Sequence, residues 1–251
     1  MSRSVFDLII AKFGKRAAFD EADREALRSL PHRPASFEPQ AYISREGDRP
    51  QQVHLLISGF AYRQKSLIDG ARQIIGVGIS GDFLDLECAL LGRADHNIQA
   101  LTRCQVAVIP CAAVDALILS HSALARAMWI QTLIDGSLFR EWIANVGRRD
   151  ARSRLAHLLC EFARRLELAG MAGELAYELP MTQEQLADTL GLTPVHVNRV
   201  LKQLETQGLI AREKRFVRIP DWEALRRIGG FNETYLHLHT PDGHAEGAVS
   251  A

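Results

Sequence analysis

The chain has 251 residues, of which 47% are hydrophobic and 24% charged, and its formal net charge is zero. These fractions are typical of a globular protein with enough apolar residues for two domains, and they argue against a disordered chain. No apolar run approaches the roughly 20 residues of a membrane-spanning helix, and no signal-peptide pattern is present. We therefore expect a cytoplasmic protein without membrane contact, in which any nucleic-acid-binding surface is a local basic patch.

The first 119 residues combine two helical segments with a series of short strands. Residues 3–13 and 20–30 have helical periodicity, and Asp20 is a suitable N-cap for the second segment. Asp69-Gly70 marks a hairpin turn, and residues 83–91 favour a short helix. Apolar runs bounded by Gly and Pro recur at intervals of about ten residues, at residues 41–43, 53–57, 60–62, 73–77, 98–101 and 105–109. This pattern predicts a small antiparallel β-barrel or β-roll.

A long helix is predicted over residues 120–147. Its apolar residues cover more than one face, as a helix needs when it packs both on its own domain and on a second copy of itself. We therefore predict homodimerisation through this helix, against the alternative of a helix buried within a monomer. The predicted dimer contacts are Leu124, Met128, Leu138 and Trp142. Gly147 and Asp150 interrupt the pattern, which predicts a hinge at residues 147–150.

A second domain is predicted over residues 148–232. Thr182 followed by Gln185 is a capping box, so a short helix begins near Thr182 and ends at Gly191. Thr193 is a good N-cap for a following helix, and a single apolar stripe is supplied by Val197, Val200, Leu201 and Leu204. Two short helices joined by such a turn predict a helix-turn-helix.

The face of the second helix opposite its apolar stripe is polar. Arginine can pair with guanine, asparagine with adenine and lysine with phosphate, so this face suits recognition in a DNA major groove. The outward residues are Thr193, His196, Asn198, Arg199 and Lys202. Residues 209–219 then alternate apolar and polar side chains around a basic tip that contains Arg215, which predicts a two-stranded wing. The whole pattern is that of a winged helix-turn-helix.

Segments on both sides of this motif complete the C-terminal half. Asp221 is placed to cap a helix over residues 222–228, which Gly229-Gly230 ends. Residues 233–251 are expected to form a tail, disordered from about residue 240. A basic cluster precedes the motif and is a candidate for phosphate contacts; it comprises Arg148, Arg149, Arg152, Arg154, Arg164 and Arg165.

The cysteines and the polar residues give no sign of a metal site or an active site. The four cysteines, at positions 88, 104, 111 and 160, form no CxxC pair and no N-terminal cluster. Zinc and iron-sulfur sites need closely grouped thiolates or imidazoles, so we expect neither a metal nor another cofactor. No phosphate loop, GxSxG, HExxH or paired-carboxylate motif stands out, and we do not expect an enzyme.

The order of roll, long helix and winged helix-turn-helix resembles the Crp/Fnr family of bacterial transcription regulators over nearly the whole chain. The resemblance rests on Gly47-Asp48, on residues 55–59, on residues 81–84 and on residues 186–209. It implies an α+β protein with a cyclic-nucleotide-binding-like jelly roll, which binds a two-fold symmetric operator as a homodimer and contacts RNA polymerase. It also implies that Arg199 contacts guanine.

Residues that would bind cyclic AMP in this family are replaced. Leu86 stands where a glutamate would hold the ribose, and Ala94-Asp95 stands where an Arg-Ser pair would neutralise the phosphate. Phe139 and Arg140 replace small hydroxyl residues that would meet the adenine. We therefore expect an unidentified small effector, or none, in place of cyclic AMP. The candidate effector pocket comprises Gly81, Asp82, Phe83, Leu84, Leu86, Asp95, His96, Asn97, Phe139 and Arg140.

Further differences concern the oxygen-sensing members and the operator. No cysteine precedes Cys88, so the N-terminal iron-sulfur cluster of those members is not expected. Val195 replaces a base-reading glutamate that many family members have. Because valine can contact a thymine methyl but cannot accept from cytosine, the operator should differ from the consensus of those members. Thr182 and Gln183, at the start of the first helix of the motif, complete the predicted DNA contacts.

Three alternatives stay open. Haem ligation by His54 or His96 is one, although a lone histidine is more often structural. Arg140 either binds a small anion or forms an ion pair with Glu141 or Asp135. Finally, the winged domain of such a sensor could dock another protein in place of DNA.

Overall fold

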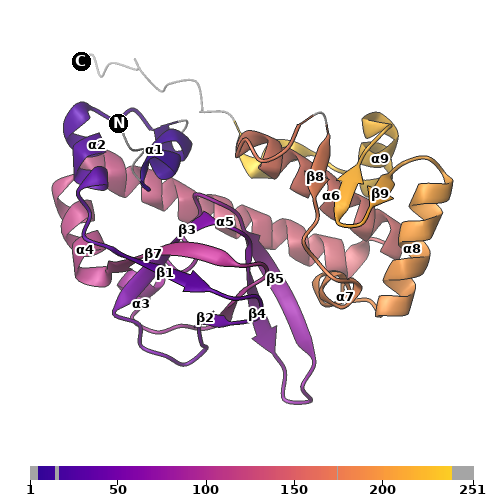
Figure 1. Ribbon diagram of the computed structural model, residues 1–251, viewed down its shortest axis with the longest axis horizontal. Helices are drawn as coiled ribbons and strands as arrows, with labels where there is room; N and C mark the ends of the chain where they lie inside the picture. The colour runs from indigo at the N-terminus through magenta and orange to yellow at the C-terminus, as the bar shows by residue number, and fades with distance from the viewer. Residues whose placement is uncertain (1–4, 15–16, 174, 239–251) are drawn as a thin grey trace, which may run out of the picture.

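The computed structural model describes residues 5–14, 17–173 and 175–238. Figure 1 shows a β-roll on one side, a C-terminal helical part on the other, and one long helix running behind both. The helices are α1 (Asp7–Gly14), α2 (Glu21–Arg28), α3 (Cys88–Leu91), α4 (Cys111–Ser120), α5 (Ser122–Arg148), α6 (Ala151–Leu168), α7 (Gln183–Leu190), α8 (Pro194–Thr206), α9 (Trp222–Gly229) and the 3-10 helix η1 (Glu233–Leu236). The strands are β1 (Arg33–Phe37), β2 (Tyr42–Ser44), β3 (Gln52–Ser58), β4 (Ala61–Ser66), β5 (Arg72–Gly78), β6 (Asn97–Ala100), β7 (Cys104–Pro110), β8 (Ala176–Glu178), β9 (Ala211–Glu213) and β10 (Phe216–Arg218).

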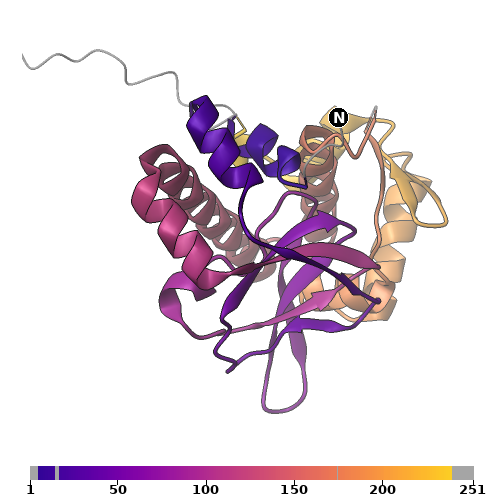
Figure 2. The ribbon, with the colours of Figure 1, turned by 60° about the vertical axis from the view of Figure 1, so that its left-hand side comes forward.

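Two antiparallel sheets form the roll, in the orders β1-β7-β3 and β2-β6-β4-β5. The β-roll of the predicted α+β class is therefore confirmed, as are the six predicted strands and the hairpin at Gly70, which lies between β4 and β5 with a positive φ. Strand β1 and helix α4 were not predicted from the sequence. Figure 2 shows the β4-β5 hairpin extending beyond the rest of the roll.

Capping explains where several helices begin. The Asp20 side chain accepts from the backbone of Asp23 at the start of α2, and the Asp150 side chain accepts from Ser153 at the start of α6. Asp221 does the same for α9 through Ala224. These aspartates satisfy backbone N–H groups that have no partner within the helix. The predicted break between α5 and α6 is confirmed, and it lies at residues 149 and 150.

The face of α5 that was predicted to meet a partner chain is largely buried within this chain. Leu124, Met128 and Trp142 lie inside the core of this chain, and Leu138 packs against the same core. Burial in this chain therefore disfavours Leu124, Met128 and Trp142 as dimer contacts, and the dimer face of α5 stays a prediction. The large apolar residues of α5 that remain exposed are Trp129, Leu133 and Ile143, whose exposed fractions are 67%, 57% and 69%.

The C-terminal segment is packed as far as the structure describes it. Leu236 is buried against the main core, and the Tyr235 hydroxyl donates to Glu161 of α6 over 2.9 Å. The predicted tail therefore does not begin at residue 233. The disorder expected from about residue 240 lies outside the described residues.

Burial keeps three cysteine thiols protonated. It raises the pKa of Cys88 and Cys160 to about 12 and that of Cys104 to about 11. Because the thiolate is the reactive form, these residues behave as small core side chains.

No single helix of the described residues is long and apolar enough to cross a membrane. Together, α4 and α5 have the length and apolar composition of a membrane-spanning segment, but the two helices are bent by 118° at their junction. Helix α5 also buries much of its apolar surface in the protein core.

The close crossing of α9 and α6 depends on the missing side chain of Gly229. A Cβ atom at this position would lie 2.7 Å from the backbone nitrogen of His157 and 3.0 Å from the carbonyl carbon of Ala156. We expect Gly229→Ala to lower the free energy of unfolding by about 2–3 kcal/mol, because backbone atoms on both sides must shift. Gly173→Ala is the control, since nothing lies within 4 Å of its Cβ position. Equal urea midpoints for the two variants would contradict this account.

Candidate DNA-binding surface and roll pocket

The helix-turn-helix has the predicted geometry. Thr182 and Gln185 form both hydrogen bonds of the capping box, Gly191 ends α7 in the left-handed conformation, and the Thr193 side chain caps α8. The four stripe residues of α8, Val197, Val200, Leu201 and Leu204, are all buried. Figure 1 shows α8 at the edge of the molecule, at the opposite end from α4. This helix is therefore free to enter a groove.

The predicted outer face of α8 lies away from the core. Thr193, Val195, Arg199 and Lys202 are exposed, with Val195 at 81%, while His196 and Asn198 are half-buried. Gln183 is exposed at the first turn of α7. The helix thus presents side chains that can reach base edges together with cations that can reach phosphates.

The wing has three strands, in the order β8-β10-β9, and not the two that were predicted. Its basic tip is confirmed: Lys214 has a positive φ of 55° and Arg215 is exposed. Strand β8 pairs residues 176–178 with β10, so the wing is joined to the segment that leads into α7.

Most of the predicted arginine cluster has a structural role. The guanidinium of Arg149 lies 2.6 Å from Glu141, and that of Arg154 donates to the carbonyl of Leu190 at the end of α7 over 2.8 Å. Arg164 binds Glu167 and Glu233, each within 2.7 Å. Arg165 faces the roll. The expectation that these four side chains bind phosphate is not supported. Arg148 is exposed, so its side chain is accessible to a phosphate.

A pocket of about 440 Å³ lies between the roll and α5. It brings together five of the ten predicted effector residues, Phe83, Leu86, Asp95, His96 and Phe139. The sequence analysis missed several lining residues from other elements, which are Arg63, Lys65, Ile75, Glu87, Gln131, Thr132, Asp135 and Gly136. These positions come together only through the antiparallel pairing of β4 with β5 and β6 and through the packing of α5 against the roll.

The other five predicted residues do not line this pocket. Leu84 is buried in the roll core, and Asn97 accepts from the backbone of Glu46. Gly81 and Asp82 belong to the junction with α1, described below. Arg140 is exposed, and its guanidinium donates to Ser137 over 2.7 Å. No carboxylate of the described residues lies within 4 Å of it, so neither of the ion pairs considered for it is present.

The two roll histidines differ in their surroundings. The ring of His54 is buried and its Nδ1 lies 2.7 Å from the carboxylate of Asp85, away from the pocket. His96 lines the pocket, with Nδ1 2.6 Å from Asp95. Among the described residues, no group of three or more His, Cys, Asp or Glu side chains is placed to hold a metal ion.

Sequence comparisons agree with this arrangement. Residues 153–228 match the Crp-like helix-turn-helix domain, and residues 34–121 match the cyclic nucleotide-binding domain. The nitrogen fixation regulation protein FixK of Bradyrhizobium diazoefficiens is 32% identical over 200 residues, which cover 78% of this chain and 82% of that protein. The chain belongs to the Crp/Fnr family.

Other members of the Crp/Fnr family are similar over most of their length. The transcriptional activator protein FnrL of Cereibacter sphaeroides is 29% identical over 223 residues, which cover 86% of this chain and 88% of that protein. The solved structure of FixK2 from Bradyrhizobium japonicum superimposes with a TM-score of 0.73 at 26% identity, covering 79% of this chain and 98% of that one. This Crp/Fnr chain is thus a DNA-binding transcription regulator, a class of protein that is not enzymatic.

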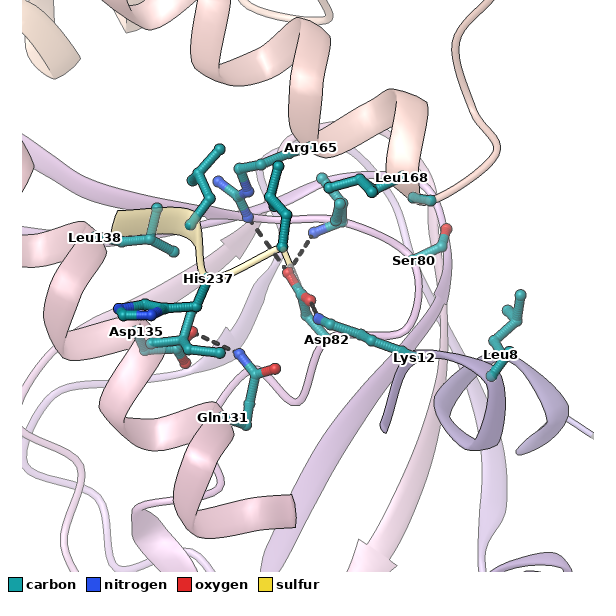
Figure 3. Close-up of a pocket in the computed structure, with 16 residues that line it drawn as sticks. Leu8, Lys12, Ser80, Asp82, Gln131, Asp135, Leu138, Arg165, Leu168 and His237 are labelled. Atoms are coloured by element: carbon teal, nitrogen blue, oxygen red, sulfur yellow. Dashed lines mark hydrogen bonds and ion pairs between the residues drawn. The ribbon is translucent and has the colours of Figure 1, made fainter. Parts of the chain in front are cut away.

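A second pocket, of about 180 Å³, lies where this regulator's roll, α5, α6 and α1 meet (Figure 3). Asp82 stands at its centre. Its carboxylate binds the ammonium of Lys12 from α1 and lies 3.5 Å from the guanidinium of Arg165 from α6. Arg165 also donates to the carbonyl of Val77 over 2.7 Å. Asp82 therefore joins the roll to both α1 and α6.

The charge of Asp82 is maintained by these partners. Burial alone would raise the pKa of Asp82, but the positive charges of Lys12 and Arg165 outweigh it and hold that pKa below its usual value. Since the lowered pKa belongs to the folded state, Asp82 stabilises the protein fully above the unfolded-state value of 3.8. This stabilisation is lost as the pH falls through the lower, folded-state pKa.

We expect Asp82→Asn to lower the free energy of unfolding by about 3 kcal/mol at pH 7, because it leaves two part-buried cations without their shared carboxylate. The difference in the free energy of unfolding between the variant and the unmodified protein should become smaller as the pH falls below 3.8. Urea unfolding at several pH values measures this difference. Glu213→Gln in the exposed wing is the control and should change stability by less than about 0.5 kcal/mol. A difference that is constant with pH would rule out the charge of Asp82 as the cause.

Proposed function

We propose that this Crp/Fnr regulator binds a two-fold symmetric operator as a homodimer, paired through α5, in the bacterial cytoplasm. The observation that carries the proposal is the exposed stripe Trp129, Leu133 and Ile143 on α5. These residues, with Gly136 and Arg140 between them, alternate by four and three positions. This is the heptad spacing of a two-stranded coiled coil.

Pairing through α5 suits DNA recognition. A two-fold axis along this helix would give the assembly two copies of α8, one for each half-site, about one helical turn of DNA apart. Arg199 would pair with guanine and Val195 with a thymine methyl, while Lys202 and Arg215 would bind phosphates. The remaining proposed contacts to bases or to the backbone are Thr182, Gln183, Thr193, His196 and Asn198.

The roll pocket supports no role for cyclic AMP. Its lining includes the carboxylates of Glu87, Asp95 and Asp135, and these would repel a cyclic phosphate. We propose that cyclic AMP does not control this protein. Names of relatives, such as the transcriptional activator protein FnrL, support the further proposal that the chain contacts RNA polymerase.

Selection of bound sites from a random DNA duplex library, without added nucleotide, tests the proposal. We expect a two-fold symmetric site to be enriched. Arg199→Ala should lose the preference for one base in each half-site, at a cost of about 1–3 kcal/mol per half-site. Lys202→Ala should weaken binding to all sequences alike, because a phosphate contact carries no sequence information. Enrichment only in the presence of cyclic AMP would overturn the effector part of the proposal.

The dimer surface is tested by Leu133→Glu. A charge buried without a partner at the centre of the seam costs several kcal/mol, so the dissociation constant should rise about 100-fold or more. Sedimentation velocity over a range of concentrations measures this. Leu119→Glu is the control, because Leu119 is equally apolar and exposed but lies at the end of α4. If both variants dimerise as the unmodified chain does, the seam lies elsewhere.

A further inference from the structure

The roll pocket contains more negative than positive charge. Three carboxylates line it, from Glu87, Asp95 and Asp135, and they face two cations, Arg63 and Lys65. Both cations are already engaged. The Arg63 guanidinium donates to the carbonyls of Leu84 and Phe83 over 2.9 and 3.0 Å and lies 3.7 Å from the carboxylate of Asp135. The Lys65 ammonium binds the carboxylate of Glu46, which does not line the pocket, so the carboxylates of the lining stay in excess. The pocket is therefore suited to a further cation and not to an anion.

His96 gives an independent sign that a hydrogen-bond donor is missing. Its Nδ1 lies 2.6 Å from the Asp95 carboxylate, which can only accept, so Nδ1 carries the proton. In the neutral ring this leaves a lone pair on Nε2. That atom is buried, lines the pocket, has no hydrogen-bond partner among the described residues and lies 3.7 Å from Glu87. An orphaned buried acceptor of this kind calls for a donor.

Arg140 is an exposed donor on α5 that forms no ion pair with the described residues. Within one chain its guanidinium turns back along its own helix and donates to Ser137. It follows directly after Phe139 and lies four residues after Gly136, and both of these residues line the pocket. Arg140 therefore borders the pocket without reaching into it.

The heptad positions of α5 predict which residues of the partner chain surround Arg140 in a dimer. If Trp129, Gly136 and Ile143 occupy one set of core positions, Leu133 and Arg140 occupy the other. In a parallel pair, each Arg140 then packs over the partner's Gly136 and Phe139. Gly136 has no side chain to obstruct it. The two Arg140 guanidinium groups would repel each other at the seam, so each has reason to turn aside toward carboxylates.

We propose that Arg140 of each chain crosses the seam and enters the roll pocket of the other chain. There its guanidinium donates to Glu87 and to Nε2 of His96, for which its several donors and lack of acceptors are suited. The inference rests on the homodimer proposed above. It makes the pocket a site completed by two chains and occupied by a cation of the protein itself.

A double-mutant cycle on the full-length protein tests this contact. Sedimentation equilibrium would give the dimer dissociation constants of the unmodified chain, Arg140→Ala, Glu87→Gln and the double variant. We expect each single substitution to weaken the dimer about tenfold, and the double variant to be hardly weaker than either one, because both changes remove the same pair. Arg126→Ala is the matched control: it removes an exposed arginine of the same helix that lines no pocket, and should change the constant less than twofold.

The outcomes separate the two proposals. If the unmodified chain stays monomeric at all concentrations, the homodimer fails and this inference fails with it. If it dimerises and Arg140→Ala has no effect, only the inference is overturned. The inference is also overturned if the increases in dissociation constant caused by Arg140→Ala and Glu87→Gln multiply fully in the double variant. The two side chains would then act independently.

Discussion

The buried carboxylate of Glu161 holds the C-terminal part of the molecule to the long helix. It has no exposed surface, and it accepts from the indole of Trp142 on α5, from the hydroxyl of Tyr235 and from the guanidinium of Arg165. Burial raises the pKa of Glu161, and these donors oppose that rise. Because a buried carboxylate without partners costs several kcal/mol, α5, α6 and η1 are stable only in an arrangement that brings all three donors together.

This network continues into the roll. Arg165 reaches from Glu161 to Asp82, and Asp82 binds Lys12 of α1, so one chain of polar contacts joins the N-terminal helix, the roll and α6. A second link joins the β4-β5 hairpin to the helix-turn-helix, where Arg72 binds Asp188 of α7 and Gln73 donates to the carbonyl of Thr189. The roll is thus joined to the C-terminal domain at two places, through α6 and through α7.

Local rules explain what the sequence could predict. Caps such as Thr182 and Thr193 act on neighbouring backbone groups, and the stripe of α8 follows from helical periodicity, so both are visible without a structure. Strand β1 was missed because its exposed edge position needs few apolar residues and contains Pro34. Arg164 and Arg165 each have one partner nearby in the sequence, but the others lie 69 and more than 80 residues away, so a run of arginines looked like a phosphate-binding patch. Only tertiary packing shows otherwise.

The same contrast between local rules and tertiary packing applies to the face of α5 that was assigned to the dimer. A helix with apolar residues on more than one face gives no indication of which face meets its own chain and which meets another. Here the core takes Leu124, Met128 and Trp142, and it leaves Trp129, Leu133 and Ile143 outside. The roll pocket lies along the border between these two faces, through Gly136 and Phe139. A pocket at such a border is shaped by whatever covers the exposed face. In the proposed dimer, the chemistry of the roll pocket would therefore follow from the partner helix as much as from the roll.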